Sequence, residues 1–434
     1  MHSADLTRVG RGTVMGNFMR QYWLPAVMSR ELAADGDPLR LLILGEHLVA
    51  FRDSAGRVGR VGIMDHHCPH RCASLFLGRN EEGGIRCVYH GWKFDMNGRC
   101  IDMPNVPPEQ DFKHKVHAKS YRTAERNGLV WVYMGDRTEA PPLPQIEANL
   151  IPQHQGSEIW CLQRNCNWLQ ALEGDIDTSH VGFLLLGSFS AAELPAGHPM
   201  RPALVNRTPK YEVSATDWGT MYGGYRPHDD GRTSWRVAHS MFPCWTQTPN
   251  IRFATRAIAR AWVPMDDEHS MLFDVSGGVD DGNPAYTSTQ PDGTPLFDAF
   301  RYAPNSSDWF GRWRCVDDAR NDWGLDRDSQ RTGRQYTGIA NITMQDQAVT
   351  ESMGAVVDHS REPLGPSDRM ITRTRRRLLN AARAFRDTGA VPPGVDTPGI
   401  FHAARAGSFV HDPEVPLQAA YRDQLAKAVR WGAP

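Results

Sequence analysis

Residues 66–94 of this 434-residue chain read HHCPHRCASLFLGRNEEGGIRCVYHGWKF, and the interpretation of the whole sequence starts from them. The stretch contains two short groups, each with one cysteine and one histidine. Cys68 and His70 form a C-x-H group, and after sixteen intervening residues Cys87 and His90 form a C-x-x-H group. Two thiolates and two neutral imidazoles suit either zinc or an iron–sulfur cluster in which two His replace two Cys on one iron.

The spacing of these ligands favours the cluster over zinc. Structural zinc more often uses paired C-x-x-C and H-x(3–5)-H spacings, whereas here each loop supplies one sulfur and one nitrogen. A Rieske 2Fe–2S cluster needs that division, because one iron takes both sulfurs and the other takes both imidazoles. We interpret the neighbouring His66 and His67 as structural or exposed, and Cys72 and Cys100 as free, buried thiols.

The sequence around the two groups predicts a small β-rich unit. LRLLILGEHLVAFRD, residues 39–53, predicts two strands joined at Gly45-Glu46. WKFDMNGRCID, residues 92–102, predicts a hairpin with Asn97-Gly98 as its two-residue turn. GLVWVYMG, residues 128–135, predicts a buried strand. A proline-rich stretch at 139–153 then indicates a boundary, so we expect a small β domain followed by a larger α+β domain.

Composition sets outer limits on function. Lys plus Arg number 48 and Asp plus Glu number 50, a formal charge of −2 that argues against nucleic acid or an anionic membrane as the main partner. No apolar run approaches the roughly 18 residues of a spanning helix, and the N-terminus lacks the apolar core of a signal peptide. We therefore expect a cytoplasmic protein. Its eight cysteines are scattered, unlike a disulfide framework.

A second group of candidate ligands lies in NWLQALEGDIDTSHVGFLL, residues 167–185. A helix is predicted here, and Asp177 and His180, three residues apart, would share one of its faces. Taken alone, such a pair is more often a cap, a surface pair or a core histidine. The cluster motif upstream makes a metal site the better interpretation. Two more helices are predicted, over ITMQDQAVTESMG (342–354) and RMITRTRRRLLNAARAFRD (369–387).

These motifs together resemble the alpha subunit of Rieske non-heme iron aromatic ring-hydroxylating oxygenases, in the branch of phthalate dioxygenase and the aryl O-demethylases. The resemblance covers nearly the whole chain, and besides the two Cys/His groups it rests on FMRQYWLPAVMSREL (18–32), NWLQALEGDIDTSH (167–180) and TMQDQAVTESMG (343–354). It implies an α+β fold, with an N-terminal segment and all-β Rieske domain at 1–142. A larger catalytic domain with a helix-grip (START-like) antiparallel sheet would occupy 143–434.

The resemblance also implies a second metal, a mononuclear Fe(II) bound by two His and one carboxylate. Its motif, Asp-x-x-His-x(4)-His, gives His180 as one ligand and Asp177 as a bridge for electrons, and the Q-D-x-A stretch gives Asp346 as the carboxylate. Glu351 is the alternative acid in the same helix. The second histidine of the motif is missing, because its position holds Leu185. We therefore expect weakened iron binding and impaired activity.

Other histidines could complete the iron site, and His198 and His239 are the candidates within the next stretch of chain. If neither does, a second interpretation is a Rieske electron-transfer or binding protein whose second domain is non-catalytic. A third is a structural module that binds zinc. The three interpretations separate by colour, by iron content and by oxygen uptake.

The resemblance further implies partners. A separate reductase with a flavin and a plant-type 2Fe–2S cluster would supply electrons, and within a homotrimer His90 of one subunit would meet Asp177 of the next. The substrates would be O2 and a small aromatic compound, with an Arg contact where that compound is a carboxylate. The products would come from dihydroxylation or from monooxygenation such as O-demethylation. Arg226, Arg236 and Arg252 are candidates for the contact, although we expect surface or structural roles for them, and a solvated helix face for Arg373 to Arg377.

Overall fold

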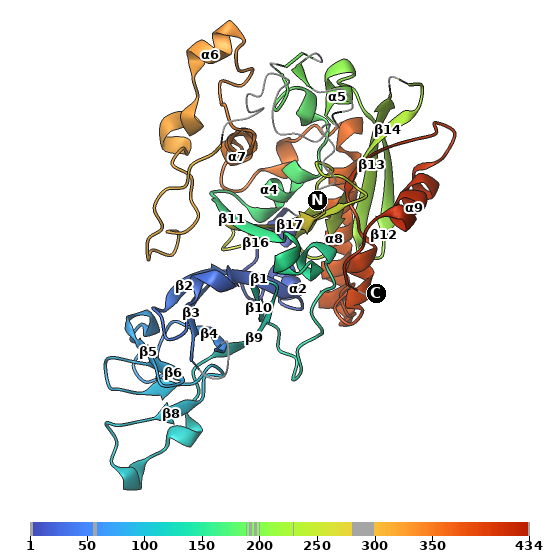
Figure 1. Cartoon of the computed structure of the whole chain (residues 1–434). Helices are drawn as coiled ribbons and strands as arrows, with labels where there is room; N and C mark the ends of the chain where they lie inside the picture. Colours follow the sequence, from blue (N-terminus) through green and yellow to red (C-terminus); the bar gives the residue numbers. More distant parts are fainter. Residues whose placement is uncertain are drawn as a thin grey trace.

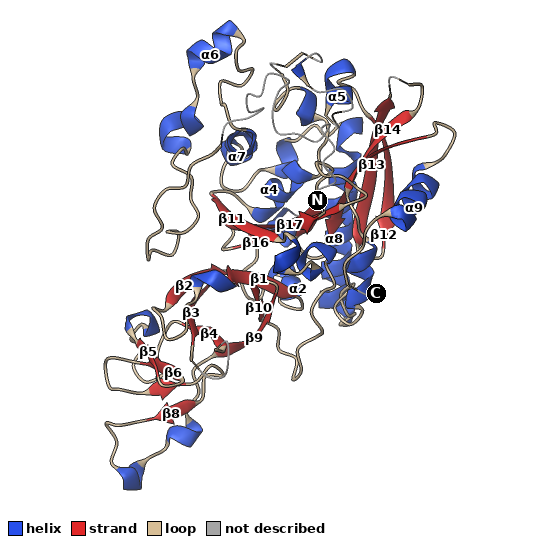
Figure 2. Cartoon of the chain, in the orientation of Figure 1, coloured by secondary structure: helices blue, strands red, loops and turns tan. Residues whose placement is uncertain are grey.

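The computed structural model describes residues 3–54, 59–187, 189–190, 193–194, 198, 200–228, 230–279 and 299–432. It has a small lobe made almost entirely of strands and a larger lobe of helices around an antiparallel sheet (Figures 1 and 2). The α+β class predicted from the sequence is confirmed. Nothing among the described helices is long and apolar enough to cross a membrane, and the cytoplasmic location remains a prediction.

The small lobe contains two antiparallel sheets. The six-stranded sheet has the order β1-β10-β9-β4-β3-β2, with strands β1 (Trp23–Met28), β2 (Leu39–Ile43), β3 (Glu46–Arg52), β4 (Val61–Asp65), β9 (Ser120–Arg126) and β10 (Leu129–Tyr133). The four-stranded sheet runs in chain order through β5 (Arg79–Glu81), β6 (Gly84–Arg86), β7 (Lys93–Phe94) and β8 (Cys100–Asp102). The first loop with a Cys/His group joins β4 of the six-stranded sheet to β5, and the second joins β6 to β7 within the four-stranded sheet.

The predicted strands are present, but both predicted turns are displaced. In the first hairpin the turn residues are Leu44 and Gly45, both with positive φ, because Ile43 pairs with Glu46. In the second, Asp95 accepts a hydrogen bond from Gly98 N, and only Gly98 of the pair Asn97-Gly98 has positive φ. The Asp95 carboxylate also accepts from the backbone N–H of Asn97 and Arg99, so a side-chain turn replaces the expected two-residue turn.

The larger lobe is organised by an eight-stranded antiparallel sheet. Its main path is β11-β17-β16-β15-β14-β13-β12, and β18 pairs with β14. The strands are β11 (Glu158–Arg164), β12 (Lys210–Thr216), β13 (Gly219–Pro227), β14 (Thr233–Met241), β15 (Trp245–Gln247), β16 (Arg256–Pro264), β17 (Ser270–Gly278) and β18 (Gly407–His411). The described helices are α1 (Ser3–Thr7), α2 (Val14–Met19), α3 (Glu147–Leu150), α4 (Trp168–Asp175), α5 (Arg201–Val205), α6 (Arg327–Thr332), α7 (Ile342–Ser352), α8 (Arg369–Thr388) and α9 (Leu417–Lys427).

Helices cover both faces of this sheet. On β13, successive side chains point to opposite faces, so Met221 and Gly223 lie on one face while Tyr222 and Gly224 lie on the other. Leu417 of α9 packs at Gly223, on the first face. The other face carries α4 and the long helix α8, which gives the helix-grip arrangement expected from the resemblance (Figure 1). The predicted helices α7 and α8 are present, whereas α4 ends at Asp175 and stops short of the residues predicted to share its face.

One continuous apolar core joins the two lobes. Trp131 of β10 stacks on Trp245 of β15, with ring centroids 5.7 Å apart, and both side chains are buried. The turn of the first hairpin is also tied to the larger lobe, because Leu44 N donates to Pro264 O and Gly45 N donates to Met265 O. The small lobe is therefore held at a defined orientation on the large sheet.

Candidate metal centres

The two Cys/His loops have the same backbone hydrogen bonds. In the first, Cys72 N donates to Cys68 O and Cys68 N donates to Ala73 O. In the second, Gly91 N donates to Cys87 O and Cys87 N donates to Trp92 O, the same pattern at the same offsets. The equivalent residues Cys72 and Gly91 both have positive φ, at 58° and 78°. The chain therefore makes the same turn twice, and each turn presents one sulfur and one imidazole.

The four predicted cluster ligands are brought together by these turns. Cys68 and Cys87 are buried, at 1% and 2% exposed. Burial, and then the neighbouring Cys87 thiol, raise the pKa of the Cys68 thiol to about 12. His70 and His90 are half-buried, with ring centroids 4.4 Å apart. Two inner sulfurs and two outer imidazoles fit the two irons of a Rieske cluster, whose positive charge would offset the cost of two adjacent buried thiolates.

The surroundings fix the outer imidazoles. Trp92 stacks on His70 with centroids 4.2 Å apart and planes 11° apart, and its Nε1 donates to Asn105 Oδ1 at 2.7 Å. Cys100 is buried, as predicted, and its thiol donates to Asp102 O. Cys72 is exposed, so the prediction of a buried thiol there was wrong. It occupies the left-handed position of the loop, which turns its side chain outward.

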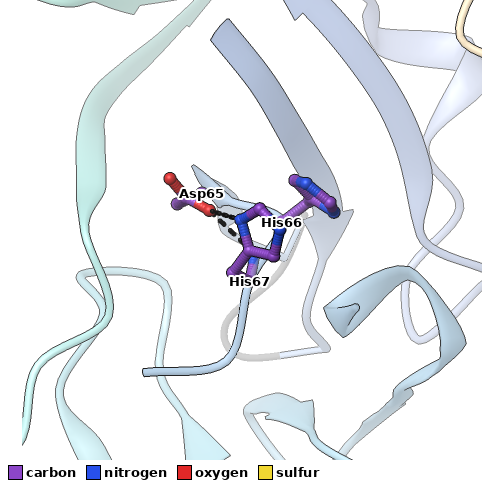
Figure 3. A group of neighbouring side chains, drawn as sticks. All are labelled: Asp65, His66 and His67. Atoms are coloured by element: carbon purple, nitrogen blue, oxygen red, sulfur yellow. Dashed lines mark hydrogen bonds and ion pairs between the residues drawn. The ribbon is translucent and has the colours of Figure 1, made fainter. Parts of the chain in front are cut away.

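A third cluster of potential ligands, Asp65, His66 and His67, lies at the end of β4 (Figure 3). Its ligand atoms lie within 4.8 Å of one another. The Asp65 carboxylate already accepts a hydrogen bond from His67 N and faces His67 Nδ1 at 3.0 Å, and His67 is exposed. The His66 ring packs near His47 and near Trp309 of the larger lobe. These contacts agree with the structural or exposed roles predicted for His66 and His67.

The second candidate centre begins where α4 ends. The Asp175 carboxylate accepts three hydrogen bonds of 2.7 Å, from Thr246 Oγ1, Arg260 Nη1 and Trp262 Nε1 on β15 and β16. These contacts tie the end of the helix to the sheet, and Ile176 already has non-helical backbone angles. Asp175 was missed at the sequence level, where an acid at the end of an apolar helix looks like an ordinary polar residue.

Asp177 and His180 lie beyond that end, in a turn and a short 3₁₀ segment (His180–Gly182), and not on one helix as predicted. Asp177 Oδ1 accepts from Ser179 N and Ser179 Oγ, and its Oδ2 lies 3.3 Å from His180 Nδ1. Gly224 makes room for the turn, because a Cβ there would lie 2.8 Å from Thr178 Cγ2. The turn thus rests directly on β13, with the two predicted side chains in contact.

Asp346, on α7, approaches His180 from the other side. Its Oδ1 lies 3.7 Å from His180 Nε2, so the imidazole sits between two carboxylates, one at each nitrogen. Burial lowers the pKa of His180, but the Asp177 hydrogen bond and the Asp346 charge outweigh burial and leave that pKa raised. Burial raises the pKa of Asp346. A metal that displaced the proton between Nε2 and Asp346 would have one nitrogen and one oxygen ligand already in place.

Glu351, the alternative acid, is engaged elsewhere. Its Oε1 accepts from Asn165 N and Gln347 Nε2, and its Oε2 accepts from Trp323 Nε1. A carboxylate satisfied by three donors in this way holds α7 to its neighbours. Asp346 is therefore the carboxylate of α7 that faces His180.

Leu185 occupies an apolar environment. It is 6% exposed and belongs to a buried cluster with Val181, Leu186, Leu194, Met200 and Ala203. Such surroundings offer packing to a methyl-bearing side chain and no lone pair to a metal. The third ligand of an iron site does not come from this position, so the donor set fits a full facial triad only in part.

The candidate replacement His239 is fully buried and fully hydrogen-bonded. Its Nδ1 accepts from Trp218 Nε1 at 3.1 Å, and its Nε2 lies 3.0 Å from Arg405 O. It pairs with Met221 on β13 and therefore lies on the α9 face, opposite the 177–180 turn. Burial lowers its pKa to about 4. His239 is a structural residue, which removes one of the two candidates; the other, His198, is buried, and its Nδ1 accepts from Met200 N.

Asp177 and His180 line an open cavity of about 550 Å³. Its other walls include Phe183 and Tyr211 and the cationic side chains of Arg207, Lys210 and Arg369. The Asp177 side of His180 is therefore open to solvent through this cavity, whereas Asp346 is not among the residues that line it.

The structure narrows one expectation about arginines and corrects another. Arg226, Arg236 and Arg252 are all buried, at 2%, 2% and 9% exposed, which excludes the surface role and agrees with the structural one. In the basic run, Arg375 is also buried and pairs with Glu173 and Glu362, which fastens α8 to α4. Helical periodicity alone could not show that one arginine of this run points inward.

Comparisons with known proteins identify the two parts of the chain. The model of the Rieske [2Fe-2S] domain matches residues 22–122, and the LigXa C-terminal domain like model matches residues 132–409. The 3-chlorobenzoate-3,4-dioxygenase oxygenase subunit of Comamonas testosteroni is 47% identical over 98% of each chain. The chain therefore belongs to the family of oxygenase components that join a Rieske 2Fe–2S domain to a LigXa-like C-terminal domain.

Two further relatives identify the branch. The Phthalate 4,5-dioxygenase oxygenase subunit of Pseudomonas putida is 34% identical over 88% of this chain and 85% of its own. The 5,5'-dehydrodivanillate O-demethylase oxygenase subunit of Sphingobium is 29% identical over 98% of this chain and 89% of its own. These are the dioxygenase and O-demethylase relatives that the motifs indicated. The enzyme interpretation is thus supported over an electron-transfer protein.

A solved structure shares the fold. The terminal oxygenase of carbazole 1,9a-dioxygenase from Novosphingobium sp. KA1 superposes with a TM-score of 0.51 at 17% identity, covering 88% of this chain and 96% of that one. At that identity the match shows the architecture alone. It agrees with a small Rieske lobe on a larger helix-and-sheet lobe.

Proposed function

We propose that this chain is the oxygenase component of a multicomponent system that oxidises a carboxylated aromatic compound with O2. The observation that carries the proposal is the His180 imidazole, which faces Asp177 at Nδ1 and Asp346 at Nε2. Relatives named for 3-chlorobenzoate and phthalate support the substrate class. Residues 1–142 would carry electrons, and residues 143–434 would bind and oxidise the substrate.

The four ligands Cys68, His70, Cys87 and His90 would hold the Rieske cluster, and His180 and Asp346 would hold the mononuclear Fe(II). The cluster supplies electrons one at a time, and the iron supplies the oxidising chemistry on O2. Asp177 fixes the orientation of the His180 ring, because a carboxylate at Nδ1 leaves Nε2 free to bind a metal. Dihydroxylation and monooxygenation are both compatible with this arrangement.

Electron supply would come from outside the chain. We propose a separate reductase with a flavin and a plant-type 2Fe–2S cluster, and a homotrimer in which His90 of one subunit meets Asp177 of the next. Two features support this pairing. His90 is half-buried beside the exposed Val88 and Tyr89, and Asp177 borders the open cavity. Both groups are thus reachable by a neighbouring molecule.

Leu185 is proposed to impair the second centre. Two protein ligands hold a metal far more weakly than three, and loss of a ligand should exceed the 10–100-fold effect typical of a partner hydrogen-bonded to a ligand. The chain as it stands should therefore purify with a full Rieske cluster, little mononuclear iron and little oxygen uptake.

Replacing Leu185→His tests this proposal. We expect mononuclear iron to rise to about one per chain, with oxygen uptake in the presence of 3-chlorobenzoate and a reductase. Leu184→His is the matched control, because it places the same imidazole one residue away on a half-buried position. Equal iron content in the two variants, or iron without oxygen uptake in Leu185→His, would instead favour a non-catalytic second lobe.

A further inference from the structure

Three potential metal ligands lie together at the end of β4, separate from the predicted ligands of both centres. Asp65, His66 and His67 each offer one ligand atom, and these atoms all lie within 4.8 Å of one another (Figure 3). Two imidazoles and one carboxylate are a donor set that zinc and other divalent transition metals accept in proteins. The group therefore has the chemistry of a metal site, although neither the Rieske cluster nor the mononuclear iron would use it.

The backbone fixes these three residues without any metal. Asp65 N donates to Lys119 O at 2.8 Å, and His66 O accepts from Leu75 N at 2.6 Å. The backbone N–H of His67 donates to the Asp65 carboxylate at 2.8 Å. Because the chain is already ordered on both sides of the group, a metal that binds there has little conformational entropy to remove.

The two rings are held to different degrees. The His66 ring packs edge-to-face against Trp309 of the larger lobe, with centroids 5.1 Å apart, and its centroid lies 3.7 Å from that of His67. The buried Nδ1 of His66 has no hydrogen-bond partner in the described chain, so metal binding breaks no hydrogen bond at that atom. The packing of His66 thus positions a ring whose ligand capacity is unused.

His67 supplies the adjustable part of the group. It is exposed, and its Nδ1 faces Asp65 Oδ1 at 3.0 Å. Zinc bonds of about 2.0–2.2 Å place neighbouring tetrahedral ligands roughly 3.4 Å apart. A small rotation of the exposed His67 ring would therefore admit the ion, which replaces the proton between the ring and the carboxylate.

Charge distinguishes this group from the other cluster of potential ligands, Glu173, His359 and Glu362. Both carboxylates of that cluster are paired to Arg375, at 2.6 Å and 2.5 Å, so a guanidinium already occupies the place of a cation. Among the described residues, no lysine or arginine lies within ion-pair distance of the Asp65 carboxylate, whose ion-pair contact is with a histidine. A divalent ion at Asp65 would meet a carboxylate that no permanently cationic side chain neutralises.

We propose that Asp65, His66 and His67 form a binding site for a divalent transition metal, and that Zn²⁺ is the ion that fits it best. Zinc accepts imidazole and carboxylate ligands and completes a three-ligand site with water, which the exposed side of His67 admits. Fe(II) binds the same donors more weakly, and Mg²⁺ and Ca²⁺ prefer sites built from oxygen. The site lies on the small lobe and does not depend on the proposed oxygenase function.

Zinc binding is measured on the purified protein with its Rieske cluster, by competition with a chromogenic chelator. We expect the unmodified chain to bind zinc at this site, and His67→Gln to weaken that binding by more than about 100-fold, because the variant loses a ligand and not merely a partner of one. Asp65→Asn keeps the acceptor for His67 N but loses the charge, so we expect an intermediate loss. Mg²⁺ should not compete.

Controls separate the site from other places where zinc could bind. His114→Gln is the matched control, since His114 is another exposed histidine of the small lobe and belongs to neither group of potential ligands. His180→Gln, which removes the imidazole of the second centre, should also leave this zinc bound. Zinc-edge X-ray absorption should show nitrogen and oxygen ligands without sulfur.

Folding is monitored in the same samples. The visible absorbance of the Rieske cluster should be equal in all variants, which shows that the small lobe is intact. Zinc should raise the unfolding midpoint of the unmodified chain and not that of His67→Gln, because an ion that binds the folded state stabilises it.

Several outcomes would overturn the assignment. Equal zinc affinity in His67→Gln and the unmodified chain would do so, and sulfur around the zinc would place the ion at the Cys68 and Cys87 loops instead. Loss of the zinc in His180→Gln would move it to the second centre, and equal binding of Mg²⁺ would exclude a transition-metal site. Oxygen uptake by Leu185→His tests the proposed oxygenase function separately, so each proposal can fail while the other stands.

Discussion

In the small lobe, the four predicted ligand residues come from two loops with the same backbone hydrogen bonds, and each loop offers one sulfur and one imidazole. In the larger lobe, His180 comes from a turn after α4 and Asp346 comes from α7, and each reaches the centre by a different route. The first centre is local in sequence, because its ligands lie within residues 68–90. The second depends on how distant segments pack.

This difference affects what a single substitution can do. The two cluster loops are themselves part of an apolar core, because Cys68 and Cys87 are packed with Leu75, Ile85 and Phe94 in the small lobe. Position 185 lies in an apolar cluster that is stable without any metal, so a leucine there packs well and leaves the fold intact. A substitution that abolishes metal binding can thus be neutral for folding in the larger lobe. In the small lobe such a substitution would not be neutral for folding.

The largest expected effect is on the cluster itself. Cys87→Ala removes one of two sulfurs from the inner iron, and we expect complete loss of the visible absorbance and of cluster iron, because no other thiol lies in that loop. Cys100→Ala is the control: Cys100 is also buried, and its thiol donates to Asp102 O outside both loops, so cluster content should be unchanged. Loss of colour in both variants would show that the lobe needs these thiols for folding and not for ligation.

A smaller effect is expected at the base of the second centre. Asp175→Asn retains the shape but loses the charge that accepts hydrogen bonds from Thr246, Arg260 and Trp262, and the free energy of unfolding should fall by about 2–3 kcal/mol. Denaturant unfolding would measure this fall. In the Leu185→His background, the same change should also lower iron content, since the 177–180 turn begins two residues later.

Asp358→Asn serves as the comparison for that experiment. Asp358 also caps a turn, through Ser360, but it is exposed and belongs to neither centre. We expect its effect on stability to be within about 0.5 kcal/mol and its effect on iron content to be nil. If Asp175→Asn behaved like this control, the sheet contacts of Asp175 would not be what positions the second centre.

The sequence predicted the local features of both centres and missed the tertiary ones. Cys68, His70, Cys87 and His90 could be identified because their spacing is the motif itself. The helix expected to carry Asp177 and His180 ends early because Asp175 is held by strands about 70 to 90 residues away, which periodicity cannot register.

Burial of charge was also beyond sequence reasoning. Arg226 and Arg375 look like surface residues by type, and only the packing of β13 and α8 shows that both are enclosed. Asp346, by contrast, was predicted from its motif, and the structure places its carboxylate near His180 while Glu351 accepts from three other donors. Iron binding by Asp346 stays a prediction.

The smallest effect at neutral pH is expected at His239, the histidine on the opposite face of the sheet from His180. Its folded-state pKa of about 4 is below the ordinary 6.5, so below pH 6.5 the unfolded chain takes up a proton that the folded chain does not. The contribution of His239 to the free energy of unfolding is therefore complete above pH 6.5 and is lost as the pH falls toward 4. His239→Gln can accept from Trp218 Nε1 and donate to Arg405 O, so at pH 7 we expect the free energy of unfolding to change by about 1 kcal/mol or less.

Below pH 6.5 the unfolding midpoint of this variant should decline less steeply than that of the unmodified chain. An identical acid decline in the variant would show that His239 is not the group whose protonation destabilises the folded chain. A loss of iron in the Leu185→His background would mean that His239 takes part in the second centre, whereas unchanged iron leaves His180 as the imidazole that faces Asp346.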